Sequence, residues 1–243
     1  MLKIKREELI IALIISVALI VAILSLPEIL LPIAKYILES LGAYWFVAIG
    51  LIGMIHGLKP DEHTWPITIS YGLMQRKLKG ALLSTAVFAG ALTVVWTALS
   101  ALTGDVFSFF TSNNLDTYVD IIVGVTMISV ALALLIHRKE DKKEKTADYK
   151  VIWVHGLAAA FGGDFIVVLI LTVATVTFLP SMFSFLVGLL FGLGSWIAQS
   201  LVVALTYKGV VRVVQDTSIM IRAGRLSLLF LGTFMIMLGL FAS

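Results

Sequence analysis

Long apolar runs separated by short polar stretches make up most of the chain. A helix needs about 20 mostly apolar residues to cross the hydrocarbon core of a bilayer. Seven runs reach this length, at residues 9–26, 43–73, 80–103, 117–136, 151–179, 181–207 and 226–243. Since only short connections remain between them, the pattern predicts an all-α, polytopic membrane protein with about seven transmembrane helices and no separate soluble domain.

The composition agrees with a membrane protein and excludes several other classes. Hydrophobic residues make up 60% of the chain, charged residues make up 14%, and the mean hydropathy is +1.04. Soluble globular domains are far less apolar. Cysteine is absent, which excludes disulfides and thiolate ligands. The lipid bilayer is therefore the expected partner, and the oligomeric state is left open.

Basic residues cluster beside alternate apolar runs. The clusters lie within residues 3–6, 76–79, 138–150 and 208–225, whereas the connections 104–116 and 179–181 contain no Lys or Arg. Cytoplasmic loops carry an excess of Lys and Arg. The alternation predicts a multi-pass protein of the cell membrane with a cytoplasmic N-terminus and an external C-terminus. Because the basic residues form no single stripe, nucleic acid is not an expected partner.

The N-terminal run is either a cleaved signal peptide or a retained span. Residues 23–32, ILSLPEILLP, contain no small-residue cleavage site. We therefore expect a retained transmembrane helix, followed by an external connection, within residues 1–42. Residues 208–225 mix basic and apolar positions, and we expect them to lie along the cytoplasmic interface.

The charged loop 137–150 is expected to be a cytoplasmic linker, and it divides the rest of the chain into two units, 43–136 and 151–243. Each unit opens with a long apolar run that contains His-Gly-Leu. Three spans per unit would place the second unit upside down relative to the first. The sequence thus predicts a 3+3 inverted repeat with broken helices plus an extra N-terminal helix, an architecture found in many secondary transporters.

The first interruption is the stretch HGLKPDEH at residues 56–63. In an unbroken helix, His56 and His63 would lie about 10.5 Å apart along the axis. That separation is too large for two imidazoles to bind one metal ion at ~2.0–2.1 Å. Pro60 removes a backbone donor and clashes with the preceding turn. A break there would let His56 fold back toward Asp61 and His63.

The alternative is an interfacial loop followed by a segment too short to span. Against it, residues 64–74 are apolar enough to continue the crossing. Asp61 and Glu62 would then lie in the first turn of a new half-helix, whose positive dipole end favours carboxylates. Glu62 is expected to contact the residues that bind a metal ion without binding the ion itself, or to serve as a charge at the helix end.

The second interruption is Gly162-Gly163-Asp164, about 14 residues into the run 151–179. A carboxylate at mid-membrane costs roughly 2.5–3.5 kcal/mol on insertion scales and by default marks a functional site. We therefore expect Asp164 to face the first interruption. His155 lies only five residues into the run, so it either joins the site or is a hydrogen-bonded histidine at the interface.

These residue types indicate a divalent transition-metal ion. Imidazole suits Ni, Co, Zn and Cu, whereas Cu(I) prefers thiolate or thioether ligands. Two or three His with one or two carboxylates and no Cys therefore predict a borderline divalent ion at His56, Asp61, His63 and Asp164. The ion would be cargo, and no resident cofactor is expected.

The residues His56-Gly-Leu-Lys-Pro-Asp61-Glu-His63 resemble the H-x4-D-H signature of the nickel/cobalt transporter family (NiCoT/NicO) of the LysE superfamily. Here Glu62 separates Asp61 from His63, where the family has no residue. The stretch His155-Gly-Leu…Gly-Gly-Asp164 is similar to the second-half element of the NicO branch. The resemblance implies a Ni²⁺ or Co²⁺ permease, not an enzyme, with His56, Asp61 and His63 at the motif positions.

Three other functions remain open from the sequence. A seven-span zinc hydrolase would hold Zn²⁺ with His56, His63 and His155. A LysE-superfamily exporter of a small anion or amino acid would bind its substrate at half-helix N-termini. A structural subunit would use the same polar residues only to pair helices. The metal (Ni²⁺, Co²⁺ or Zn²⁺), the transport direction and the coupling ion cannot be read from the residues.

Overall fold

The structure is a computed structural model, and within the residues it describes the chain is entirely α-helical. Ten α-helices and one short 3-10 helix are present there, without any strand. The described residues are 4–25, 30–41, 44–102, 115–136, 146–162, 165–176 and 180–241. Asp164 and most of the charged linker 137–150 lie outside these ranges.

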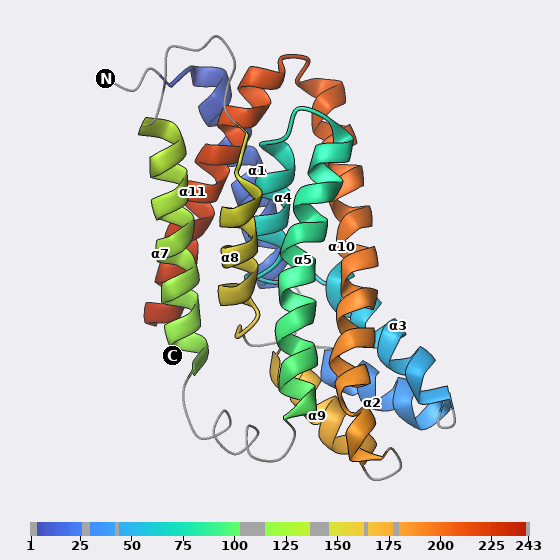
Figure 1. The fold of residues 1–243 in the computed structure, drawn as a ribbon. Helices are drawn as coiled ribbons and strands as arrows, with labels where there is room; N and C mark the ends of the chain where they lie inside the picture. Colours follow the sequence, from blue (N-terminus) through green and yellow to red (C-terminus); the bar gives the residue numbers. More distant parts are fainter. Residues whose placement is uncertain are drawn as a thin grey trace.

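The described residues of the first half of the chain form six helices (Figure 1). They are α1 (Arg6–Ser25), α2 (Leu30–Leu41), α3 (Trp45–Leu58), α4 (Trp65–Leu73), α5 (Leu78–Ala101) and α7 (Leu115–Ile136). The second half contains α8 (Tyr149–Ala159), α9 (Phe165–Val176), the 3-10 helix η2 (Ser181–Phe183), α10 (Phe185–Val213) and α11 (Thr217–Phe241).

Four of these helices, α1, α5, α10 and α11, are long and apolar enough to cross a membrane. This agrees with a multi-pass membrane protein. The helix α3 and apolar parts of α7 and α9 are shorter. The long runs 43–73 and 151–179 are each divided into two short helices, α3 with α4 and α8 with α9. Both predicted interruptions are thus present, while the number of spans stays a prediction.

Residues 208–225 do not form a separate segment, while their position at the cytoplasmic interface stays a prediction. The helix α10 continues to Val213 and α11 begins at Thr217, so only three residues between them are not helical. Asp216 allows this short connection because its carboxylate accepts the backbone N–H of Ser218 at 2.7 Å at the start of α11. That hydrogen bond lowers the pKa of Asp216, an exposed residue.

Two basic residues of this region are buried, one of them fully and the other in part. Arg225 is buried on α11, and Arg222 donates to the buried Glu8 of α1 at 3.2 Å. The same region of contact includes a hydrogen bond between the hydroxyls of Ser16 and Ser227. A basic residue therefore need not face the interface here, because α1 supplies a partner. The connection after α1 also contains an unpredicted helix, α2, which packs on α3.

The helices pair in a regular way across the two halves of the chain. The helix α5 packs on α10, and α7 packs on α11. In addition, α3 packs on α10 as α8 packs on α5, and α4 packs on α5 as α9 packs on α10. These contacts are paired between the two halves, whereas the contacts of α4 with α11 and of α8 with α7 are not matched in this way. The helix α1 lies against α11, outside this set of pairs (Figure 1).

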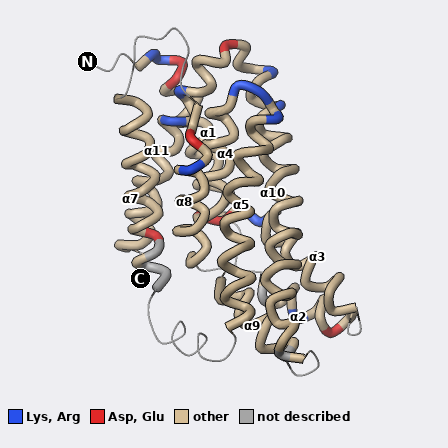
Figure 2. The backbone as a smooth tube through the Cα atoms, in the orientation of Figure 1, with Lys and Arg blue, Asp and Glu red and all other residues tan. Residues whose placement is uncertain are grey.

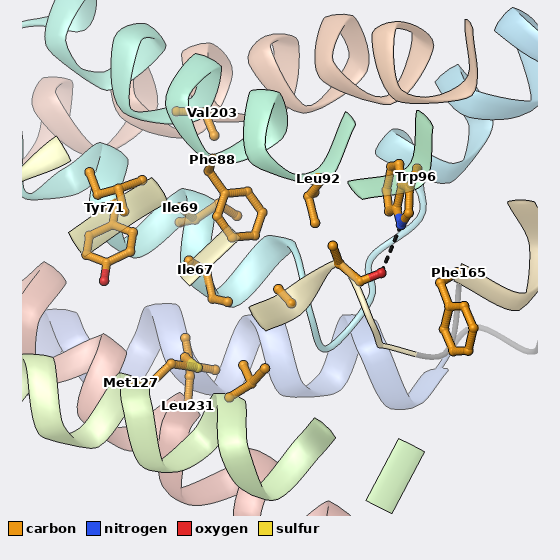
Figure 3. Close-up of a cluster of buried hydrophobic side chains, with 14 of the residues drawn as sticks. Ile67, Ile69, Tyr71, Phe88, Leu92, Trp96, Met127, Phe165, Val203 and Leu231 are labelled. Carbon is orange, nitrogen blue, oxygen red and sulfur yellow. Dashed lines mark hydrogen bonds between the residues drawn. The ribbon is translucent and has the colours of Figure 1, made fainter. Parts of the chain in front are cut away.

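Apolar side chains from both halves form one large core (Figure 3). It includes Tyr71 from α4, Phe88 and Trp96 from α5, Phe165 from α9 and Phe191 from α10. In a bilayer, helices associate by close packing and interhelical hydrogen bonds, because lipid tails are as apolar as Leu. This core therefore depends on shape more than on exclusion of water.

Charged residues are distributed unevenly along the molecule (Figure 2). Most Lys and Arg residues lie toward the end that carries the N-terminus and the α10–α11 connection. The α4–α5 turn lies at the same end, because the hydroxyl of Tyr207 near the end of α10 donates to the carbonyl of Gln75 at 3.3 Å. A few charged positions lie at mid-height, between α5 and α10.

Candidate functional site

The break between α3 and α4 is organised by Asp61. After Pro60, which has no backbone donor, the Asp61 carboxylate accepts the backbone N–H of His63 at 2.9 Å and of Thr64 at 2.8 Å. It also accepts the hydroxyl of Thr64. These groups would otherwise be unsatisfied at the start of α4. Asp61 thus caps the turn at residues 62–64 that leads into α4, at the end where the helix dipole favours a carboxylate.

His63 lies among carboxylates at this break. Its Nε2 is 2.8 Å from Oδ1 of Asp120 on α7, and its Nδ1 is 3.6 Å from Oε1 of Glu62. His63 is only 5% exposed and Asp120 only 6%. A buried carboxylate needs a charged or hydrogen-bonded partner. Each of the two side chains therefore stabilises the other inside the bundle.

The second break packs directly against His63. A Cβ added to Gly162, just after α8, would lie 2.7 Å from Nδ1 of His63. Only a residue without a side chain allows the imidazole to approach the backbone this closely. The two predicted interruptions, about one hundred residues apart in the sequence, therefore meet at the His63 ring.

Both breaks lie beside the middle of a long helix. A Cβ on Gly57 would be 2.9 Å from Cβ of Ala198, near the centre of α10. A Cβ on Gly156 would be 2.7 Å from the carbonyl oxygen of Phe88, near the centre of α5. The His63–Gly162 contact is thus far from either end of the bundle.

Indole groups satisfy carbonyls at both breaks. Trp65 Nε1 donates to the carbonyl of Gly57 at 3.3 Å, and Trp96 Nε1 donates to the carbonyl of Ala160 at 3.0 Å. The second bond is the dashed line in Figure 3. The last carbonyls of a helix have no partner within it. Each half-helix can therefore end inside the bundle without an orphan acceptor at these positions.

His56 lies in an aromatic environment. Its ring stacks on Phe191, with centroids 5.1 Å apart. It also makes an edge-to-face contact with Trp96, with centroids 5.5 Å apart. The side chain is fully buried. His155 makes different contacts, with its ring nitrogens 2.6 Å from the hydroxyl of Tyr71 and 2.7 Å from that of Thr126. The three buried histidines thus have three separate surroundings.

The structure brings some of the predicted site residues together. Asp61, Glu62 and His63 share the first break, whereas His56 contacts aromatic rings and His155 contacts hydroxyl groups. Among the residues that are described, no group of three or more His, Asp or Glu could hold a metal ion. Asp164 follows Gly162 by two residues and lies outside the described ranges. The ligand set inferred from the sequence therefore stays a prediction.

Asp120 is the residue that sequence analysis missed. It lies four residues inside the apolar run 117–136 and resembles a charge at the end of a span. The sequence could have indicated it. Sixteen uncharged residues follow Asp120, and placing a carboxylate inside such a membrane helix costs free energy unless it has a partner. Only the packing of α7 beside the first break identifies its partner as His63.

The arrangement suits a cation better than an anion. The N-terminus of α4, where an anion would bind, already holds the Asp61 carboxylate. His63 has three carboxylates near it in sequence or space, and imidazole with carboxylate is a ligand combination for divalent metals. Comparison of the chain with protein-family models, with curated proteins and with solved structures gives no match.

Proposed function

We propose that the protein is a secondary transporter that carries a divalent transition-metal ion, Ni²⁺ or Co²⁺ first and Zn²⁺ next. The observation that carries this proposal is the buried His63–Asp120 pair at the point where two helix breaks meet. Broken helices that meet inside the membrane are typical of secondary transporters. Buried ionisable residues in such a place by default mark the path of an ion.

The cargo would bind between His63 and Asp120, with Glu62 beside the other nitrogen of the imidazole. Imidazole supplies a neutral ligand, and the carboxylates offset the two positive charges of the ion. Asp120 Oδ1 and His63 Nε2 are 2.8 Å apart, so the ion must separate them in order to bind either. A site closed by its own ion pair suits an ion in transit, because tight permanent binding would prevent release. With His63, the family resemblance implies His56 and Asp61 as ligands, and the sequence predicts Asp164 beside them.

The architecture we propose is a 3+3 inverted repeat with seven membrane crossings. The reciprocal packing of α5 with α10, and of α7 with α11, supports a two-fold relation between the halves. In this arrangement α3 with α4, and α8 with α9, each share one crossing. The basic end would face the cytoplasm.

The proposed orientation can be tested on the chain itself, which contains no native cysteine. A single Thr217→Cys, in the exposed α10–α11 region, should react with an impermeant thiol reagent only from inside. Met182→Cys, exposed in η2, should react only from outside. The reverse pattern would overturn the orientation and leave the transport proposal standing.

The alternatives from the sequence fit the contacts less well. A three-histidine zinc centre would need His56, His63 and His155 together, but their contacts are separate. An anion exporter would need a free half-helix N-terminus, and Asp61 caps that of α4. In a purely structural subunit, apolar residues could replace the buried ion pair without loss of stability. A structural role therefore does not account for the pair.

The decisive experiment is metal-dependent flux into proteoliposomes with Ni²⁺, Co²⁺, Zn²⁺, Mn²⁺ and Fe²⁺. We expect flux of at least one of the first three ions. His63→Gln and Asp120→Asn should each lower it at least tenfold, while the exposed control Asp216→Asn should leave it unchanged. His56→Gln separates the two ligand sets, because it lowers flux only if the resemblance-based set is right. A folded wild-type protein without flux of any of the five ions would contradict the proposal.

A further inference from the structure

His155 lies at a junction of three helices. Its Nδ1 is 2.6 Å from the hydroxyl of Tyr71 on α4, and its Nε2 is 2.7 Å from the hydroxyl of Thr126 on α7. His155 itself belongs to α8 and is only 2% exposed, and Tyr71 is fully buried. One imidazole therefore links a half-helix of the first break to a half-helix of the second and to α7.

The hydrogens of this network can be assigned from its geometry. The Thr126 hydroxyl also lies 2.8 Å from the carbonyl of Val123, to which it donates. Its oxygen must then accept from His155, which places a proton on Nε2. Neutral imidazole has one donor and one acceptor. Nδ1 therefore accepts from the Tyr71 hydroxyl, and every hydrogen of the chain Tyr71–His155–Thr126–Val123 has an acceptor.

The neutral form follows from burial. A charged imidazolium would donate from both nitrogens, and Tyr71 would then have to turn its own hydrogen away from His155. Both ring nitrogens of His155 face neutral hydroxyl groups. Burying a charge without a charged partner is far more costly than burying a neutral, fully hydrogen-bonded ring.

We propose that His155 is a positioning residue that fastens α4 to α8 and α7 as a neutral imidazole protonated on Nε2. With both nitrogens engaged, it is not a ligand of the cargo. The helix α7 carries both Thr126 and Asp120, and the break before α4 carries His63. The His155 bridge thus holds the two elements that present His63 and Asp120 to each other.

Selective ¹⁵N labelling of the histidines in the full chain tests the assignment directly. His155 should give the NMR signature of a neutral ring with Nε2–H and unprotonated Nδ1, assigned by its disappearance in His155→Gln. Thr126→Val should perturb the Nε2 signal and Tyr71→Phe the Nδ1 signal. A ring protonated on Nδ1, or on both nitrogens, would overturn the proposal.

Substitution distinguishes a bridge from a metal ligand. Glutamine can accept from Tyr71 and donate to Thr126, so His155→Gln should keep the unfolding temperature near that of the wild type. His155→Leu, Tyr71→Phe and Thr126→Val each remove at least one buried hydrogen bond and should lower it by about 2–4 °C. Thr97→Val is the matched control, because Thr97 bonds only to Thr93 of its own helix.

The consequence for flux rests on the proposed function. Tyr71→Phe and Thr126→Val touch no proposed ligand, yet they should raise the cation concentration needed for half-maximal flux several-fold. His155→Gln should leave that concentration near the wild-type value. If His155→Gln is as inactive as His155→Leu while Tyr71→Phe is normal, His155 is a ligand and the inference fails. If the wild type carries no cation, the proposed function fails, while NMR and unfolding still decide the role of His155.

Discussion

The two His-Gly-Leu stretches differ in what surrounds their histidines, although both of their glycines allow close packing against a long helix. Gly57 lets α3 approach the middle of α10, and Gly156 lets α8 approach the middle of α5. His56, by contrast, stacks on an aromatic ring, whereas His155 bridges two hydroxyl groups. A shared motif here reflects shared packing and does not imply shared chemistry.

The described parts of the two breaks also differ in the groups that they contribute. The first has Asp61 at its turn and a buried His63–Asp120 pair. The second contributes the backbone at Gly162, against which His63 packs, and Asp164 follows outside the described residues. Within the described residues, the first break therefore provides the ionisable side chains and the second provides the surface beside them.

The largest expected effect is loss of one partner of the buried pair. Asp120→Ala or His63→Ala should each lower the free energy of unfolding by about 3–5 kcal/mol, because the remaining group loses its buried partner. The measurement is reversible unfolding in detergent. The double variant His63→Leu/Asp120→Leu should recover most of this loss. Additive losses in the double variant would mean that the two side chains do not interact.

The next largest effect on stability is expected at the glycines of the two His-Gly-Leu stretches. Gly57→Ala and Gly156→Ala should each destabilise by about 1–3 kcal/mol, because the added methyl group overlaps the backbone of α10 or α5. Gly50→Ala is the matched control, since nothing lies within 4 Å of its added Cβ. The control should be neutral or slightly stabilising. Equal behaviour of all three variants would contradict the close helix contacts.

The next effect concerns the buried Asp61 before α4 and the exposed cap Asp148 of α8. Asp61→Ala should cost about 2 kcal/mol, at the upper end for a helix cap, because it exposes several buried groups. Asp148→Ala, which removes an exposed cap of α8, should cost well under half as much. Differential scanning fluorimetry of both variants measures this order. A larger loss for Asp148→Ala would show that α4 does not depend on its cap.

The indole bonds should give a smaller contrast between the breaks. Trp96→Phe removes a buried 3.0 Å bond to Ala160, and we expect a loss of about 1 kcal/mol. Trp65→Phe removes a longer, partly buried bond of 3.3 Å and should cost roughly half of that. Chemical unfolding of the two variants checks the order. Similar losses would mean that burial does not distinguish the two breaks.

The smallest effect concerns pH. Because the pKa of Asp216 is lowered in the folded protein from its ordinary value of 3.8, its carboxylate stabilises the fold above that pH. The contribution is lost as the pH falls through the folded pKa. The stability difference between wild type and Asp216→Ala should therefore shrink only in acid, below about pH 4. A difference that shrinks near neutral pH would point to another group.

Much of the fold was predictable because it depends on local composition. Apolar runs of sufficient length predict membrane helices, and Pro60 with neighbouring charges predicts the first break. The sequence did not predict that α10 and α11 extend into residues 208–225, so that only three residues there are not helical. The sequence pattern does not reveal that Arg222 finds Glu8 on α1, more than two hundred residues away.

The sequence by itself determined an all-α chain with helices apolar enough to cross a membrane, the two interruptions and the ionisable residues at them. Only the tertiary structure decided which of these residues meet. It placed Asp120 beside His63, enclosed His56 between aromatic rings, and engaged both nitrogens of His155. The physical reason is that hydropathy and helix breaking act over a few neighbouring residues, whereas the partner of a buried polar group is set by how distant helices pack.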